Sequence, residues 1–131
     1  MHAEFVIPGA GAFEVAAHKE LMVFKETIKG RAMLGVEAFA TALLVIPKVL
    51  AQNAGFDQQD SLVKLQQEQV VGGPLVGLDL QSGEPFIPAD MGIFDNHRVK
   101  KQILHSWSVL FYPLALISLD FVSKEGTTKL A

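Results

Sequence analysis

The stretch that decides the fold is Leu75–Lys101, LVGLDLQSGEPFIPADMGIFDNHRVKK. Residues 76–80 alternate apolar side chains with glycine and aspartate, which is the period-two pattern of a half-buried strand. Residues 81–84 have turn chemistry, because Gly83 can adopt a positive φ. Residues 86–87, enclosed by two prolines, predict a short return strand at a sheet edge, since proline cannot donate to a ladder. The stretch therefore predicts a β-hairpin.

The same stretch ends at the start of a helix. Residues 96–106 carry apolar side chains at helical spacing, which predicts a helix over this range. Asp95 or Asn96 can serve as its N-cap, because a short side-chain oxygen accepts a free amide of the first turn. A carboxylate beside a hairpin and at the mouth of a helix can also accept hydrogen bonds from sugar hydroxyls. For such a motif taken alone, capping is the more common role.

A second notable segment lies near the N-terminus. Residues 8–12 read PGAGA, and from Phe13 to Ile28 apolar residues recur at helical spacing. Glu14 falls in the first turn, where the helix dipole favours a negative charge. A glycine loop that opens a helix can present amides to an anion or to a sugar–base moiety. A tight turn with close helix packing explains the same residues without any ligand.

The middle of the chain is predicted to be helical and strongly apolar. Residues 31–54 are apolar on most faces, which is typical of a helix buried in a core or in a membrane. Pro47 predicts a kink or two abutting helices, and it interrupts the ~20 residues that a membrane span requires. Gly55 predicts a helix end, and Asp57 predicts the N-cap of a further helix over residues 58–69.

The composition restricts the classes of function. The chain has 131 residues, enough for one domain with a modest core, and its 50% hydrophobic content is high for a soluble domain. A net charge of −3 argues against nucleic-acid binding. The absence of cysteine excludes disulfides and a thiolate nucleophile. The N-terminus lacks the layout of a signal peptide. The histidines are dispersed, so we expect no metal site: they are His2, His18, His97 and His105.

Three segments carry a family resemblance. They are GLDLQSGEP with MGIFDNHRVKKQILHS (77–85 and 91–106), KGRAMLGVEAFATALLVIPKVLAQNAGFD (29–57) and VIPGAGAFEV (6–15). Together they resemble the C-terminal equatorial segment of group II chaperonins of the TRiC/CCT type, and most of all their zeta subunits. The resemblance covers roughly residues 6–106. It implies a mainly α fold with a small β-hairpin, equivalent to the C-terminal half of a chaperonin equatorial domain.

The resemblance also implies a set of residues that bind ATP or ADP. The backbone of Ala10 and Gly11 would lie beside the ribose and base, and Asp95 would accept the ribose hydroxyls. Apolar side chains would contact the base, and a lysine would add a point charge near the nucleotide. Without the resemblance, that lysine is interpreted as a solvated side chain on a helix. The implied nucleotide-binding residues are Ala10, Gly11, Asp79, Leu80, Ile93, Asp95 and Lys100.

The family's ATPase chemistry needs parts that the resembling segments do not include. In the family, a glycine-rich phosphate loop, a metal-binding aspartate and a further aspartate lie in segments upstream of the position that corresponds to Met1. The pattern G-x-x-x-x-G-K-[ST] does not occur in this sequence either. Because phosphoryl transfer depends on charge stabilisation by metal and basic groups, we expect no catalytic residue, no Mg²⁺ ligand and no ATP hydrolysis by this chain alone.

The resemblance therefore predicts part of a cytoplasmic, ATP-dependent chaperonin subunit that assists protein folding, truncated to the base and ribose side of its ATP pocket. The implied partners are other chaperonin subunits in a hetero-oligomeric double ring, and unfolded client proteins. Neither nucleic acid nor a membrane is an expected partner.

The sequence departs from the family at about Trp107. Residues 107–122 are apolar but shorter than a usual membrane span, and Pro113 opposes an uninterrupted helix. We therefore predict a partial equatorial domain over 1–106 and a divergent apolar tail over 107–131. Three alternatives stay open: a non-catalytic module that docks on chaperonin rings, a membrane-associated helical protein anchored by the tail, and a chain without a function of its own.

Overall fold

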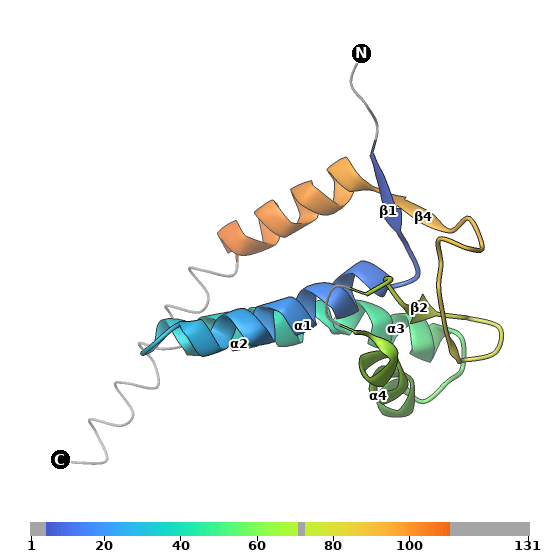
Figure 1. The fold of residues 1–131 in the computed structure, drawn as a ribbon, viewed down its shortest axis with the longest axis horizontal. Helices are drawn as coiled ribbons and strands as arrows, with labels where there is room; N and C mark the ends of the chain where they lie inside the picture. The colour runs from blue at the N-terminus through green and yellow to red at the C-terminus, as the bar shows by residue number, and fades with distance from the viewer. Residues whose placement is uncertain (1–4, 71–72, 111–131) are drawn as a thin grey trace. The chain divides into compact units, whose positions relative to one another are not determined.

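The computed structural model describes residues 5–70 and 73–110, which belong to two compact units, Met1–His97 and Arg98–Ala131. The prediction of a mainly α fold with a small β-hairpin is confirmed. Figure 1 shows the elements in chain order: β1 (Val6–Pro8), α1 (Ala12–Thr27), α2 (Ala32–Leu43), α3 (Val45–Asn53), α4 (Gln58–Glu68), β2 (Gly77–Leu78), β3 (Pro85–Phe86) and β4 (Phe94–Asn96).

The helices α1 and α2 form an antiparallel pair that lies side by side (Figure 1). The helix α1 begins after Gly11, as the small-residue loop predicted, and Glu14 lies in its first turn. Two polar contacts join the pair. A His18 ring nitrogen, Nδ1, lies 3.0 Å from the Ala40 carbonyl oxygen, and the Lys25 ammonium donates to the Glu37 carboxylate at 2.8 Å. The pair is therefore fixed along its length by side chains as well as by packing.

The predicted interruption at Pro47 is confirmed as a break between α2 and α3 at Leu44. Proline has no amide hydrogen to donate to the carbonyl four residues earlier, which here belongs to Leu43, and its ring also clashes with that carbonyl. Just before this position the Leu44 amide donates to the carbonyl of Thr41, three residues earlier, at 3.2 Å. The chain therefore tightens before it enters α3. The break thus lies three residues before the proline that causes it.

The end of α3 and the start of α4 follow standard capping rules. The Phe56 amide donates to the Ala51 carbonyl at 2.9 Å and the Gly55 amide to the Gln52 carbonyl at 3.0 Å, which is a Schellman motif with Gly55 at φ 85°. The Asp57 carboxylate then accepts hydrogen bonds from two amides of the first turn of α4, both at 2.9 Å. Both sequence predictions are confirmed here.

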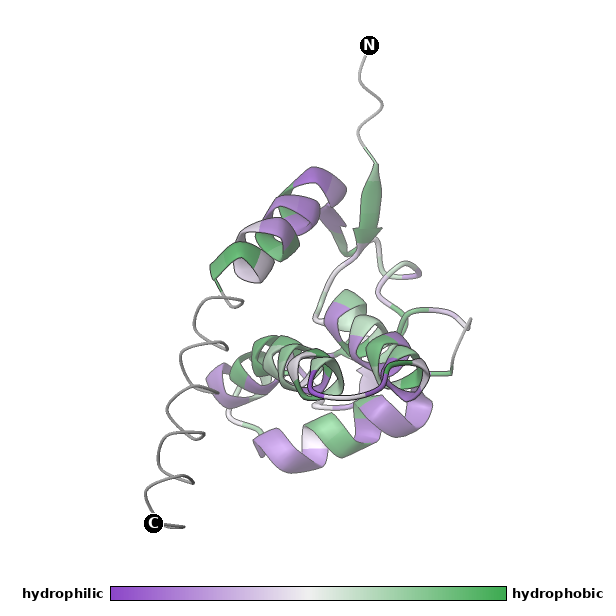
Figure 2. Cartoon of the chain, turned by 90° about the vertical axis from the view of Figure 1, so that its left-hand side faces the viewer, coloured by the Kyte–Doolittle hydropathy of each residue, from purple (hydrophilic) through white to green (hydrophobic). Residues whose placement is uncertain are grey.

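The hydrophobic core lies where α1, α3, α4 and β2 meet. The helix α4 contributes Leu62 and Leu65, whereas most of its residues are hydrophilic, as the purple turns in Figure 2 show. The core is small for a chain that is half apolar. Its buried members are Val15, Leu44, Ala51, Leu62, Leu65, Val76 and Leu78.

A stripe of apolar residues along α2 and α3 stays exposed. Leu34, Val45 and Val49 have exposed fractions of 52%, 53% and 42%, and Ala38 and Thr41 on the same stripe are exposed as well. Taken as one span, Ala32–Asn53 has a mean hydropathy of 1.8 and is long and apolar enough to cross a membrane. The core helix of a soluble domain has the same length and composition, so the span does not distinguish the two environments.

Two short antiparallel strand pairs complete the first unit. The predicted hairpin is β2–β3, with Gly77 opposite Phe86 and Leu78 opposite Pro85. Its return strand is Pro85–Phe86 rather than 86–87, because the Ile87 carbonyl accepts from the Asp90 amide and so belongs to the next turn.

The second strand pair, β1–β4, was not predicted, and it changes the position of Asp95. This residue lies inside β4, opposite Ile7, two residues before the helix begins. Asn96, the other predicted cap, directly precedes the helical residues 97–110.

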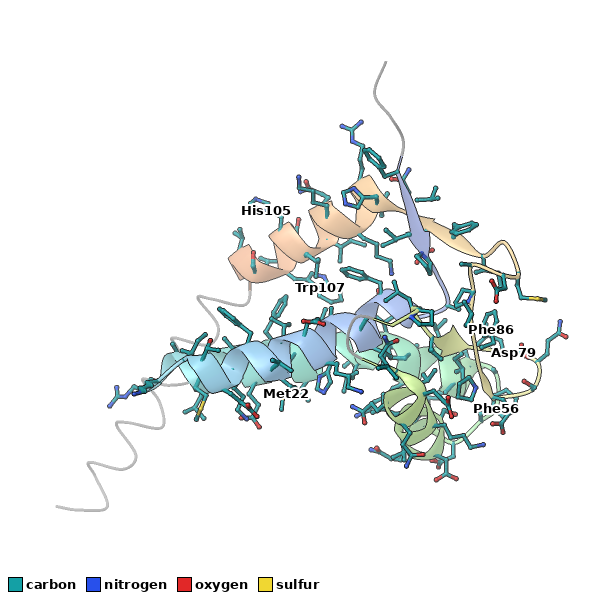
Figure 3. All side chains as sticks on the ribbon, in the orientation of Figure 1. Met22, Phe56, Asp79, Phe86, His105 and Trp107 are labelled. Carbon is teal, nitrogen blue, oxygen red and sulfur yellow. The ribbon has the colours of Figure 1, made fainter. Side chains whose placement is uncertain are left out.

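The second unit is described only by its helical residues up to 110. The helix continues past Trp107, where the divergent tail was predicted to start. Figure 3 labels His105 and Trp107 on this helix. Val99, Ile103 and Ser106 of this helix line one hollow together with Trp107. Pro113 and the rest of the predicted tail lie outside the described residues.

Candidate functional site

The β1–β4 pair brings the small-residue loop against Asp95. Gly9, directly after β1, donates its amide to the Ile93 carbonyl at 3.1 Å. A Cβ atom placed on Gly9 would lie 3.3 Å from Asp95 Oδ1 and 3.3 Å from Ile93 Cγ2. The loop and the carboxylate are far apart in the sequence, yet they lie close together because Gly9 has no side chain.

The backbone of the loop adopts two successive left-handed residues. Ala10 has φ 56° and Gly11 has φ 76°. A left-handed residue other than glycine costs roughly 1–2 kcal/mol, so Ala10 keeps this conformation only because its surroundings hold it. Two hydrogen bonds do so. The Ala12 amide donates to the Gly9 carbonyl at 3.1 Å, and the Leu78 amide donates to the Ala10 carbonyl at 3.0 Å.

The strand β2 supports the loop from the other side. A Cβ atom placed on Gly77 would lie 2.8 Å from Pro88 Cγ, 2.9 Å from the Ala10 carbonyl oxygen and 3.0 Å from Ala10 Cβ. These separations are too short for any side chain, so the β2 backbone lies directly against the loop. The left-handed Ala10 is thus held by the Leu78 amide, Gly9 before it by the Ile93 carbonyl, and Gly11 after it lies against Pro47 and Leu50 of α3.

The Asp79 carboxylate is bound within its own turn. Its Oδ1 accepts from the Gln81 amide at 2.9 Å, and its Oδ2 accepts from the Ser82 hydroxyl at 2.6 Å. Figure 3 shows Asp79 with Phe86 and Phe56 at this turn, and a Cβ atom on Gly83 would lie 2.8 Å from the Phe56 ring. The hydrogen bonds from Ser82 and then Gln81 lower the pKa of the Asp79 carboxyl below its usual value of 3.8.

This lowered pKa makes the turn sensitive to acid. Because the pKa of Asp79 is lower in the folded chain than in the unfolded chain, its stabilising effect is complete above pH 3.8 and is lost as the pH falls through the lower, folded value. We expect Asp79→Asn to reduce the drop in melting temperature between pH 6 and pH 3. Asp90→Asn, at an exposed position in the next turn, is the control and should leave that drop unchanged.

The structure brings together some of the predicted site residues. Ile93 and Asp95 meet at Gly9, directly before Ala10, and Ile93 is 43% exposed, so its side chain is open to a ligand. Gly11 follows directly as the N-cap of α1. Asp79 and Leu80 belong to the β2–β3 turn, where Leu80 is 47% exposed.

Lys100 is half-buried and belongs to the second unit, whereas the other predicted residues belong to the first. Sequence reasoning missed Gly9, which packs against Asp95 and Ile93, and Gly77, which packs against Ala10 and Pro88. The PGAGA motif drew attention to the loop, but nothing local indicates which of its residues faces Asp95.

Metal binding finds no support in the described ranges. Within residues 5–70 and 73–110, no group of three or more histidine, aspartate and glutamate side chains is placed to hold a metal ion.

Comparison with known proteins places these observations in a family. The family model described as the TCP-1/cpn60 chaperonin family matches residues 1–110. The human T-complex protein 1 subunit zeta-2 is 54% identical over 125 residues, which is 95% of this chain and 23% of that protein. The mouse T-complex protein 1 subunit zeta-2 is 46% identical over the same shares. The chain thus spans about a quarter of the length of these relatives.

Solved structures agree on the fold. An open-state monomer of a group II chaperonin from Methanococcoides burtonii superposes with a TM-score of 0.77 at 32% identity, over 84% of this chain and 27% of that one. A group III chaperonin in the open state gives a TM-score of 0.77 at 33% identity, over 84% and 22% of the two chains. The predicted resemblance to chaperonins of the zeta type is confirmed.

Proposed function

Because this chain belongs to the TCP-1/cpn60 chaperonin family, we propose that it is part of a cytoplasmic, ATP-dependent chaperonin subunit that assists protein folding. Its share of the nucleotide site is the side that meets the base and ribose. The family match over residues 1–110 supports the chaperonin assignment, and the zeta-2 relatives support the cytoplasmic location. The partners proposed on the same ground are other chaperonin subunits in a hetero-oligomeric double ring, and unfolded client proteins.

The observation that carries the nucleotide proposal is the contact between Gly9 and Asp95. Gly9 has no side chain, and the Asp95 carboxylate lies where one would point, because a Cβ atom there would be 3.3 Å from Asp95 Oδ1. Carboxylate oxygens accept hydrogen bonds, which is the chemistry that ribose hydroxyls require. Ile93 and Leu80 are exposed apolar side chains that suit the face of a base.

The residues present thus fit the nucleoside part of ATP or ADP. When bound, ATP would supply the phosphoryl group for hydrolysis. The groups that bind the phosphates and Mg²⁺ are not assigned to residues of this chain. Lys100 remains a proposed neighbour of the nucleotide.

Isothermal titration with ADP tests this function. We expect Asp95→Ala to weaken binding roughly 10- to 100-fold, since a hydrogen bond to a charged group contributes about 1.5–3 kcal/mol. Asp90→Ala removes a carboxylate from an exposed turn of the same segment and should bind like the unsubstituted chain. Equal affinity in all three proteins, with unchanged circular dichroism, would contradict the assignment of Asp95.

A second function is favoured by the exposed apolar stripe on α2 and α3. Leu34, Val45 and Val49 are exposed apolar side chains that a partner can cover, so the chain can also serve as a non-catalytic module that docks on chaperonin rings. Co-sedimentation with assembled rings measures this directly. Val45→Asp should abolish it, whereas retained co-sedimentation would exclude the stripe as the docking surface.

A further inference from the structure

Gln69 is a buried polar residue whose side chain is fully used in hydrogen bonds. It is 2% exposed and directly follows α4. Its Oε1 accepts from the buried Val76 amide at 3.0 Å, and its Nε2 donates to the carbonyls of Val70 and Pro74 at 3.2 and 3.4 Å. Its backbone carbonyl accepts from the Lys19 ammonium of α1. A buried amide side chain is costly unless its polar atoms are paired, and here they are.

These hydrogen bonds fix the segment that enters β2. Val76 is 7% exposed and lies just before the strand, so its amide has no ladder partner and depends on Gln69. Two residues later, Leu78 donates its amide to the Ala10 carbonyl at 3.0 Å. Hydrogen bonds therefore connect Lys19 to Gln69, Gln69 to Val76, and Leu78 to the left-handed loop.

Termination of α4 does not by itself explain this arrangement. The backbone amide of Gln69 already closes the helix by donating to the Leu65 carbonyl at 3.0 Å. A helix end requires no side chain that turns inward and reaches an amide seven residues ahead. The side chain of Gln69 thus holds Val70, Pro74 and Val76, and through Val76 the strand that bonds to the loop.

We propose that Gln69 is a positioning residue of the nucleotide site. It holds residues 76–78 so that the Leu78 amide keeps Ala10 and Gly11 in their left-handed conformation, with Lys19 fixing Gln69 from the other side. The link to nucleotide rests on the proposed function above. The link to the loop rests on the hydrogen bonds alone.

Amide hydrogen exchange measured by NMR, combined with ADP titration, tests the proposal on the whole chain. The variants are Gln69→Met, which keeps length and volume but removes every side-chain hydrogen bond, and Gln67→Met, its matched control at an exposed position of α4. We expect exchange of the Leu78 amide to accelerate about tenfold in Gln69→Met, and the ADP dissociation constant to rise about tenfold. The control should change neither quantity.

A role in packing alone predicts a different result, since methionine fills the same volume and would preserve the Leu78 amide. Unchanged exchange at Leu78 in Gln69→Met therefore overturns the proposal. Accelerated exchange at Leu78 in a chain that does not bind ADP supports the positioning of the loop and overturns the proposed function instead.

If Gln69→Met unfolds, Lys19→Met is tested instead. This substitution removes the hydrogen bond to the Gln69 backbone carbonyl and leaves the Gln69 side chain in place. Faster exchange confined to residues 76–78 and the loop supports the proposal. Exchange that is uniform along the chain or unchanged overturns it.

Discussion

Gly77→Ala is expected to destabilise the chain by about 3 kcal/mol and to displace the loop at Ala10. The added Cβ would lie 2.8 Å from Pro88 and 2.9 Å from the Ala10 carbonyl oxygen, and the second of these is backbone that cannot rotate away. Overpacking of this kind costs typically 1–3 kcal/mol, and this site is at the upper end because strand and loop must separate. Urea unfolding monitored by circular dichroism measures the loss.

Gly35→Ala is the matched control for this substitution. Gly35 lies inside α2, and a Cβ atom there meets nothing within 4 Å. Alanine is favoured over glycine in a helix by roughly 0.5–1 kcal/mol, so the same chemical change should stabilise the chain at this position. If both variants changed stability by the same amount, the close approach of β2 to the loop would not exist in solution.

Leu65→Ala is expected to remove about 2–5 kcal/mol of stability. Leu65 of α4 is 0% exposed and belongs to the core together with residues of α1, α3 and β2. Since a whole domain is stable by only ~5–15 kcal/mol and this core has few members, the loss is a large fraction of the total. We expect the variant to be partly unfolded at 37 °C by circular dichroism.

Val63→Ala shows whether burial causes that loss. Val63 is on the same helix but 48% exposed, so truncation there should change stability by roughly 0.5 kcal/mol or less. A comparable loss in both variants would mean that α4 does not bury the face carrying Leu65.

The helices could be predicted from the sequence because their signals are local. Asp57 caps α4, Gly55 ends α3 and Pro47 separates α3 from α2, each through atoms within a few residues of its own position. The hairpin was also predicted, since period-two alternation and a glycine turn are local patterns. Its return strand was misplaced by one residue because Ile87 belongs to the following turn.

The β1–β4 pair could not be predicted from local patterns. Each strand has three residues, too few to show periodicity, and the partners lie at opposite ends of the unit. For the same reason Asp95 was expected beside a helix mouth and was found within a strand. Without that pairing, the proximity of Gly9 to Asp95 has no signal in the sequence, so the resemblance to chaperonins alone suggested which residues form one site.

The central claim is that residues 9–11 and Asp95 form one surface for a nucleoside. Titration of the ¹⁵N-labelled chain with ADP, followed by amide chemical shifts, tests it most directly. The account predicts that the amides of Gly9, Ala10, Gly11, Ile93 and Asp95 shift together along a single binding curve, while those of α4 stay unchanged. Saturable shifts confined to other residues, or shifts at the loop without any at Asp95, would contradict it.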